Sequence, residues 1–269
     1  MVWVMWRQHR AQVLATVGLL LLLEVYLLVA GQDAAVVLGW LPIAPLLIGI
    51  FWGAPLLARE LERGTHRLAW TQSVTRQRWL LSKLGGLSLV VTVAGLALGL
   101  MVSTWVTAHD ADRFGDTALF GGSGVVAGAW WLFAFLLGSA AGGLLRRLLP
   151  ALALTIVVFL VMLFAMVQSR GNFAEPLRSL DDYPAAGTLG TAATWLAPSG
   201  EEVDTPPVCL DASRLTYLGC VEDAGYRSVY YYQPADRYWR FQWTETGILL
   251  LCTVLLAGPV VYRVLRRPV

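Results

Sequence analysis

Charged residues are scarce in this 269-residue chain: they make up 14% of it, against 57% for hydrophobic residues. An average soluble domain has about 25% charged and about 45–50% apolar residues. The hydrophobic residues lie in runs too long for a water-soluble core, so a single soluble globular domain is excluded. The net charge is only +2, which gives no support for nucleic-acid binding because proteins of that class usually carry a strongly basic face.

Lysine and histidine are also scarce, and their positions exclude several catalytic classes. Ser82 precedes the only lysine, Lys83, and Leu84 follows it, whereas a P-loop requires Gly-x-x-x-x-Gly-Lys-Ser/Thr. The metalloprotease motif His-Glu-x-x-His and the hydrolase motif Gly-x-Ser-x-Gly are absent. The three histidines, at positions 9, 66 and 109, are too scattered to predict a metal cluster. We therefore expect no enzyme activity and no bound cofactor or metal in this chain.

Long apolar runs predict a membrane protein. A spanning helix needs about 20 mostly apolar residues to cross a hydrocarbon core about 30 Å thick. Six windows meet this requirement: Ala11–Ala30, Leu38–Ala58, Leu84–Ala108, Gly121–Leu145, Leu148–Val167 and Thr246–Tyr262. Backbone polar groups cannot stay unpaired in hydrocarbon, so we expect helices. The predicted fold class is an all-α polytopic membrane protein, with five spans in residues 11–167 and the sixth in residues 246–269.

The basic residues predict the orientation of these spans. Thirteen of the 20 Lys and Arg residues lie in the termini and in the connections after the second and fourth windows. Basic residues in short loops favour the cytoplasmic side, so both termini are predicted to be cytoplasmic. The 78-residue connection 168–245 is then an extracellular domain.

The N-terminal segment 1–12 alternates aromatic or aliphatic residues with basic or polar ones. At helical spacing Trp3 and Trp6 share a face. This pattern predicts an interfacial helix that lies in the lipid headgroup layer. A basic flank that only orients the first span is the alternative.

Glu24 is the one charged residue inside the predicted spans. A charge at the centre of a membrane helix costs about 2.5–3.5 kcal/mol, so Glu24 should face protein or water rather than lipid. We interpret Glu24 as a residue that lines a substrate pathway between protomers. A structural hydrogen bond to a neighbouring helix is the alternative.

The internal connection 59–83 is far longer than is needed to join two spans, and it is dense in charges. Gly64 can end one helix, and Thr65 can cap a short second one. This helix–turn–helix pattern indicates a surface shaped for a cytoplasmic partner, with a solvated charged face as the alternative. The predicted contact residues are Arg59, Glu60, Glu62, Arg63, Gly64, Thr65, Arg67, Trp70, Thr71, Arg76 and Arg78.

The pattern Arg59-Glu60-x-Glu62-x-Gly64-Thr65, after the second of six spans, resembles the type-2 permease family of ABC transporters. The stretches 6–10, 70–76 and 232–243 look like its actinobacterial branch. The resemblance implies that the internal connection is a coupling helix seated in a cleft of a separate ATPase subunit, which holds ATP and Mg. It also implies short helices within residues 226–243 that dip back toward the bilayer.

The same resemblance implies an assembly and an activity. We expect two ATPase subunits and a second permease copy, forming a homodimer in the bacterial plasma membrane. The expected activity is export of a hydrophobic or amphipathic compound, such as a drug, an antimicrobial peptide or a lipid, by alternating access.

Cysteines, glycines and prolines add three structural expectations. Cys209 and Cys220 lie in the oxidising outer connection, so we predict a disulfide between them and a free Cys252. Glycine pairs at four-residue spacing predict close helix packing within the chain, or alternatively dimerisation; they are Gly49/Gly53, Gly95/Gly99, Gly124/Gly128 and Gly138/Gly142. Three prolines should make the second span irregular beside a cavity: Pro42, Pro45 and Pro55.

Two other classes of function stay open. A proton-coupled carrier would use Glu24 as its proton site and would need no ATP. A membrane receptor or scaffold would use the extracellular insertion to bind a ligand without translocation.

Overall fold

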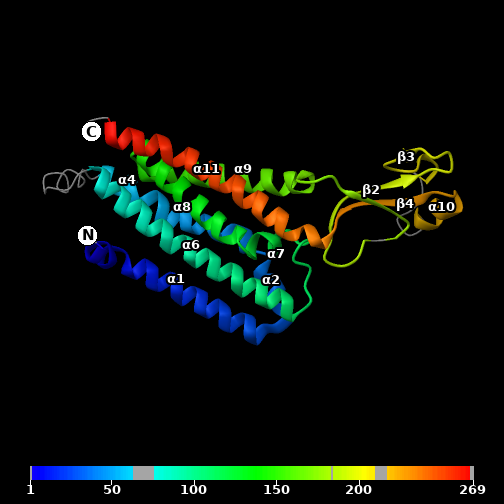
Figure 1. Cartoon of the computed structure of the whole chain (residues 1–269), viewed down its shortest axis with the longest axis horizontal. Coiled ribbons are helices and arrows are strands. Elements are labelled where there is room, and N and C mark those ends of the chain that lie inside the picture. The colour runs from blue at the N-terminus through cyan, green and yellow to red at the C-terminus, as the bar shows by residue number, and fades with distance from the viewer. Residues whose placement is uncertain (1, 63–75, 183, 210–216, 267–269) are drawn as a thin grey trace.

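The computed structural model describes residues 2–62, 76–182, 184–209 and 217–266. It is an elongated helical bundle from one end of which a small sheet projects (Figure 1). The longer helices are α1 (Val2–Ala30), α4 (Ala54–Glu62), α6 (Arg76–Ala108), α8 (Val126–Leu145), α9 (Leu148–Ser169) and α11 (Tyr238–Arg266). Within the described residues, six stretches are long and apolar enough to cross a membrane: His9–Leu38, Leu41–Arg59, Leu81–Ala108, Val126–Leu145, Leu148–Asn172 and Ala235–Gly258. The prediction of six apolar helices long enough to span a membrane is therefore confirmed.

Helix α8 is the centre of the bundle. It packs against α4, α6, α9 and α11, and most of its side chains are buried. Close packing depends on glycine: a Cβ atom on Gly138 would meet the Gly49 carbonyl oxygen and come within 2.7 Å of the Ala54 nitrogen. A Cβ atom on Gly95 would lie 2.9 Å from the Gly128 Cα atom. All four predicted glycine pairs lie at such contacts within the chain, so intrachain packing explains them.

Replacing Gly138 with Ala is expected to destabilise the bundle, because the added methyl group meets backbone atoms that cannot move aside. Overpacking of this kind typically costs about 1–3 kcal/mol. Gly247→Ala is the matched control, because nothing lies within 4 Å of a Cβ atom built there. Thermal unfolding of the full chain in detergent should show a lower Tm for Gly138→Ala alone. Equal Tm values for the two variants would contradict the packing argument.

The second span is irregular, as its prolines predict. It comprises η2 (Leu41–Ile43), α3 (Ala44–Ile48), the π-helical η3 (Gly49–Gly53) and α4. Proline lacks an amide hydrogen, so Pro55 cannot pair with the carbonyl of Phe51 four residues earlier. The Gln12 side chain of α1 donates a hydrogen bond to this Phe51 oxygen over 3.3 Å. The irregular span is thus tied to α1.

The fourth span begins later than the window Gly121–Leu145 predicts. A short helix α7 (Thr117–Gly122) precedes it, and the chain turns before α8 begins at Val126. Gly124 has φ +63°, in the left-handed region that glycine adopts without strain. This conformation separates α7 from α8.

The segment between α9 and α11 contains a four-stranded antiparallel sheet with the order β1-β4-β2-β3. It projects from the end of the bundle away from both chain ends (Figure 1), so we call the segment the outer insertion and that end of the bundle the outer end. Its strands are β1 (Leu177–Leu180), β2 (Leu189–Leu196), β3 (Glu202–Val203) and β4 (Arg227–Gln233). The all-α prediction is wrong here, because these short segments pair with partners far away in the sequence. The expected short helices within residues 226–243 are replaced by β4, the single turn η6 (Ala235–Arg237) and the start of α11.

The predicted disulfide is present and joins Cys209 to Cys220, whereas Cys252 is free. It connects the turn η5 (Pro207–Cys209) with the short helix α10 (Tyr217–Asp223) at the far end of the sheet. Both chain ends lie at the opposite end of the bundle (Figure 1).

Helix α1 is continuous from Val2 to Ala30. The predicted interfacial segment 1–12 is therefore not separated from the first span by a break within the described residues, and its place in the headgroup layer stays a prediction. After α1 the chain turns through η1 (Gly31–Ala34) and α2 (Ala35–Leu38) before the second span.

Candidate functional site

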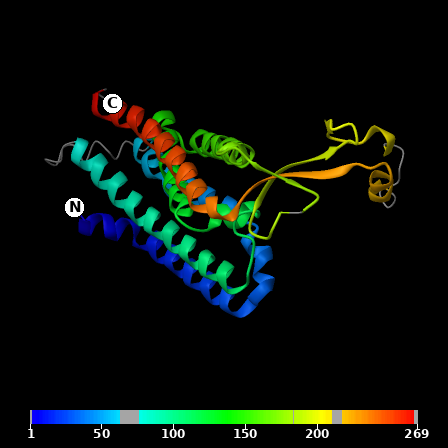
Figure 2. The same cartoon turned by 45° about the vertical axis from the view of Figure 1, so that its right-hand side comes forward.

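A groove runs along the seam between α1 and α6, at the edge of the bundle. The two helices lie side by side, and α1 packs mainly against α6 (Figures 1 and 2). Among the described side chains of α1, only Leu27 is buried. The groove has a volume of about 560 Å³, and Thr16 and Glu24 are the only polar residues that line it. The seam is thus a long apolar surface with a single carboxylate.

A second cavity of about 210 Å³ continues the seam toward the outer end. It shares Glu24 and Met101 with the larger groove and reaches Trp105 and His109. The Trp105 indole N–H donates to the Gly31 carbonyl oxygen over 3.0 Å. The His109 ring stacks on Trp105, with ring centroids 4.8 Å apart, and its Nδ1 donates to the Trp105 carbonyl oxygen over 2.9 Å. These bonds fix the wall of the outer cavity.

Glu24 lies where the two cavities meet. Its side chain is half-buried, and no hydrogen bond or ion pair from any described residue reaches its carboxylate. The structural alternative, a hydrogen bond to a neighbouring helix, thus has no partner in the described part of the chain. The pathway role stays a prediction that this geometry favours.

A buried ion pair at the outer end of the bundle was not predicted. Arg170 Nε donates to Glu245 Oε2 over 3.1 Å, and the two side chains are 4% and 0% exposed. The Trp130 indole N–H donates to Glu245 Oε1 over 2.9 Å, and the Arg170 guanidinium lies 4.1 Å from the Phe120 ring centroid. This cluster ties α8, the end of α9 and α11 together. The available signal was the opposite charges at the two ends of the outer insertion.

Side chains from the first turns of α11 form hydrogen bonds with the segment that separates α7 from α8. Gln242 Oε1 accepts the Val126 amide over 3.0 Å, and its Nε2 donates to the Phe120 carbonyl oxygen over 3.1 Å. The hydroxyl groups of Tyr238 and Ser123 are 2.9 Å apart. Backbone groups that the break leaves free are therefore paired by α11 side chains.

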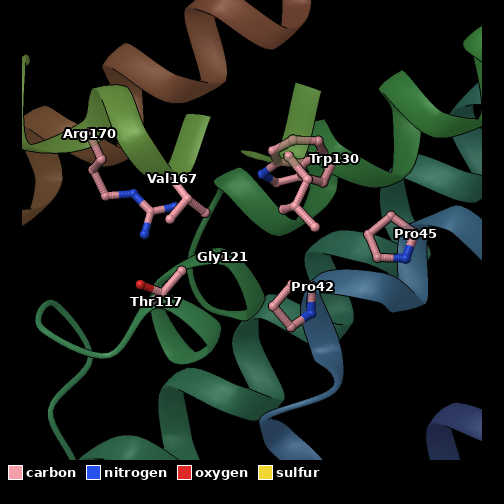
Figure 3. A pocket seen from close by; sticks show the side chains of 8 residues that line it. Pro42, Pro45, Thr117, Gly121, Trp130, Val167 and Arg170 are labelled. Carbon is pink, nitrogen blue, oxygen red and sulfur yellow. The ribbon is translucent and has the colours of Figure 1, made fainter. Parts of the chain in front are cut away.

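A small cavity lies beside the Arg170–Glu245–Trp130 cluster (Figure 3). Pro42 and Pro45 of the second span face it from one side, and Trp130, Val167 and Arg170 line other sides. Its volume is about 10 Å³, close to the minimum that holds one water molecule. The irregular second span does border a cavity, but this one is too small for a transported compound.

The structure describes only some of the predicted coupling residues, because residues 63–75 lie outside the described residues. Helix α4 ends at Glu62, and α6 begins at Arg76. The structure describes the helical positions Arg59, Glu60, Glu62, Arg76 and Arg78. The others lie outside the described residues: Arg63, Gly64, Thr65, Arg67, Trp70 and Thr71.

Glu62 has a contact that the sequence did not indicate. Its Oε2 atom accepts a hydrogen bond of 3.4 Å from the Leu148 amide, at the start of α9. A carboxylate is favourable at a helix N-terminus, because the unpaired amides there carry partial positive charge. Glu62 therefore links the end of α4 to α9 while its side chain stays exposed.

Three side chains on the outer sheet form an exposed cluster. Arg178 Nη2 and Tyr231 Oη each donate to the Glu202 carboxylate over 2.6 Å. The hydrogen bond from Tyr231, followed by that from Arg178, holds the pKa of Glu202 below its ordinary value. The same bond to Glu202 raises the pKa of Tyr231. The cluster links β1, β3 and β4 at the exposed surface of the sheet.

Comparison with protein families gives a match to part of the chain. The family described as "ABC-2 membrane transporter related" matches residues 22–170, which is more than half of the chain. The matched part runs from the last turns of α1, which include Glu24, to the end of α9. No curated protein and no solved structure matches the chain.

Proposed function

Because the chain belongs to the ABC-2 membrane transporter related family, we propose that it is the permease subunit of an ATP-driven exporter of a hydrophobic or amphipathic compound. It is a multi-pass membrane protein with six apolar helices. The observation that carries the proposal is that the family match, over residues 22–170, covers the later part of the first span and the second to fifth spans of the bundle. Transport thus belongs to the bundle rather than to the outer sheet.

ATP hydrolysis is supplied by two separate ATPase subunits that hold ATP and Mg. Each binds the internal connection between α4 and α6 of one permease copy, and two copies form a homodimer in the bacterial plasma membrane with cytoplasmic termini. Both helices that flank this connection pack against α8, so a push on the connection reaches the centre of the bundle. Closure of the ATPase dimer would switch the spans from inward-facing to outward-facing.

The test is reconstitution in liposomes with and without an ABC ATPase encoded beside this chain. We expect the ATPase to co-purify with the chain, and accumulation of a fluorescent amphipathic compound to require both proteins and ATP. Walker-A Lys→Ala in the ATPase is the control: it removes the lysine that contacts the ATP phosphates and so prevents ATP use, while the permease is unchanged. Full transport by this chain without a companion protein, or transport driven by a proton gradient without ATP, would contradict the proposal.

A further inference from the structure

We propose that the α1–α6 groove binds a lipophilic organic cation, with the Glu24 carboxylate as its counter-ion. The assignment of this cation as cargo rests on the proposed export function. The groove has a volume of about 560 Å³, and the cavity that extends it has about 210 Å³. These volumes suit a compact molecule of several rings. Drug-sized ligands occupy pockets of about 300–1,000 Å³.

Charge determines the class of ligand. Glu24 is the one acidic or basic side chain that lines the larger groove, and no described residue neutralises it. An unpaired carboxylate against apolar surface is unfavourable, and a positively charged ligand relieves that cost. An anionic compound would add repulsion, so the groove discriminates by charge sign as well as by size.

The shape of the seam supports a path as well as a site. The lining residues on α1 run from Val13 to Leu28, a rise of about 22 Å at 1.5 Å per residue. Glu24 and Met101 belong to both cavities, so a cation held at Glu24 touches the apolar groove on one side and the Trp105–His109 wall on the other. An aromatic ring such as Trp105 is also a favourable neighbour for a cation.

Two other occupants fit less well. The acyl chains of a phospholipid can lie against the apolar lining, but they supply no positive charge to Glu24. A second copy of this chain that met the seam across a two-fold axis would bring the same patch, whose lining residues include Glu24 but no basic side chain, because such an interface is self-complementary. A cation is the occupant that complements the charge.

The test compares two ions of nearly equal size and shape, tetraphenylphosphonium and tetraphenylborate. Equilibrium binding to the purified full chain, without any ATPase, should show saturable binding of the phosphonium and none of the borate. Glu24→Gln should weaken phosphonium binding by about tenfold or more, since it removes one partner of a poorly solvated charge pair. Glu24→Asp should retain most of the binding. Asp236→Asn, which removes an exposed outer carboxylate, is the matched control and should bind like the native chain.

A second variant tests the groove without touching the charge. Ala97 lines the α6 side, so Ala97→Trp should fill the space and lower phosphonium binding as well. Equal affinity for both ions, no binding to the native chain, or unchanged binding by Glu24→Gln would each overturn the inference. So would loss of a native dimer or of a co-purified lipid in Glu24→Gln, because the seam would then belong to that occupant. The ATPase experiment above is independent, so either proposal can fail alone.

Discussion

Replacing Arg170 with Met is expected to cost about 3–5 kcal/mol of folding free energy, the usual loss when one partner of a buried ion pair is removed. The cost arises because Glu245 is 0% exposed and would lose the only ion-pair partner that the described residues give it. The Trp130 indole N–H would remain as its hydrogen-bond donor, which is too little to compensate a buried carboxylate. Unfolding of the full chain in mixed micelles, followed by tryptophan fluorescence, measures the loss.

The double variant Arg170→Met with Glu245→Gln separates loss of charge from loss of packing. The amide oxygen of Gln can still accept from Trp130, and no charge is left unpaired, so most of the lost stability should return. Arg178→Met is the matched control: it breaks the exposed pair with Glu202, and exposed pairs contribute little. Wild-type stability in Arg170→Met, or no recovery in the double variant, would contradict the role of the pair.

The spans were predictable because hydrocarbon imposes a local rule on each segment: about 20 apolar residues in a row. Glycine spacing and proline positions are also local signals, and both gave correct expectations about packing and irregularity. The Cys209–Cys220 disulfide followed from the location of both residues in one outer connection. None of these predictions required knowledge of which helices are neighbours.

The buried pair and the sheet required knowledge of distant contacts. Arg170 and Glu245 were assigned to the outer insertion because their charges end the apolar runs, yet each lies in the bundle and neutralises the other. Strand β4 pairs with β1, about 50 residues earlier in the chain, and no local pattern specifies that register. Glu24 was recognised as unusual from the sequence, but its groove, and the lack of a partner for its carboxylate among the described residues, depend on how α1 meets α6.

Transport should be uncoupled from ATP hydrolysis when Glu60 and Glu62 are both replaced with Ala in the reconstituted complex. The two residues lie in the last turns of α4, next to the proposed ATPase contact. Loss of this contact should lower the transport rate about 5- to 150-fold, the range of a coupling free energy of about 1–3 kcal/mol. Hydrolysis by the ATPase should continue, so transported molecules per ATP is the quantity to measure.

The Glu62–Leu148 hydrogen bond offers a competing explanation, in which the double variant merely loosens the start of α9. Glu62→Gln keeps an acceptor for the Leu148 amide while it removes the charge, so a coupling defect in Glu60→Ala with Glu62→Gln excludes that explanation. Glu201→Ala with Glu222→Ala removes the same charge from exposed positions in the outer insertion and should leave coupling intact. Because force must enter at the α4–α6 connection in this mechanism, normal coupling in all three double variants would exclude these carboxylates from the ATPase contact.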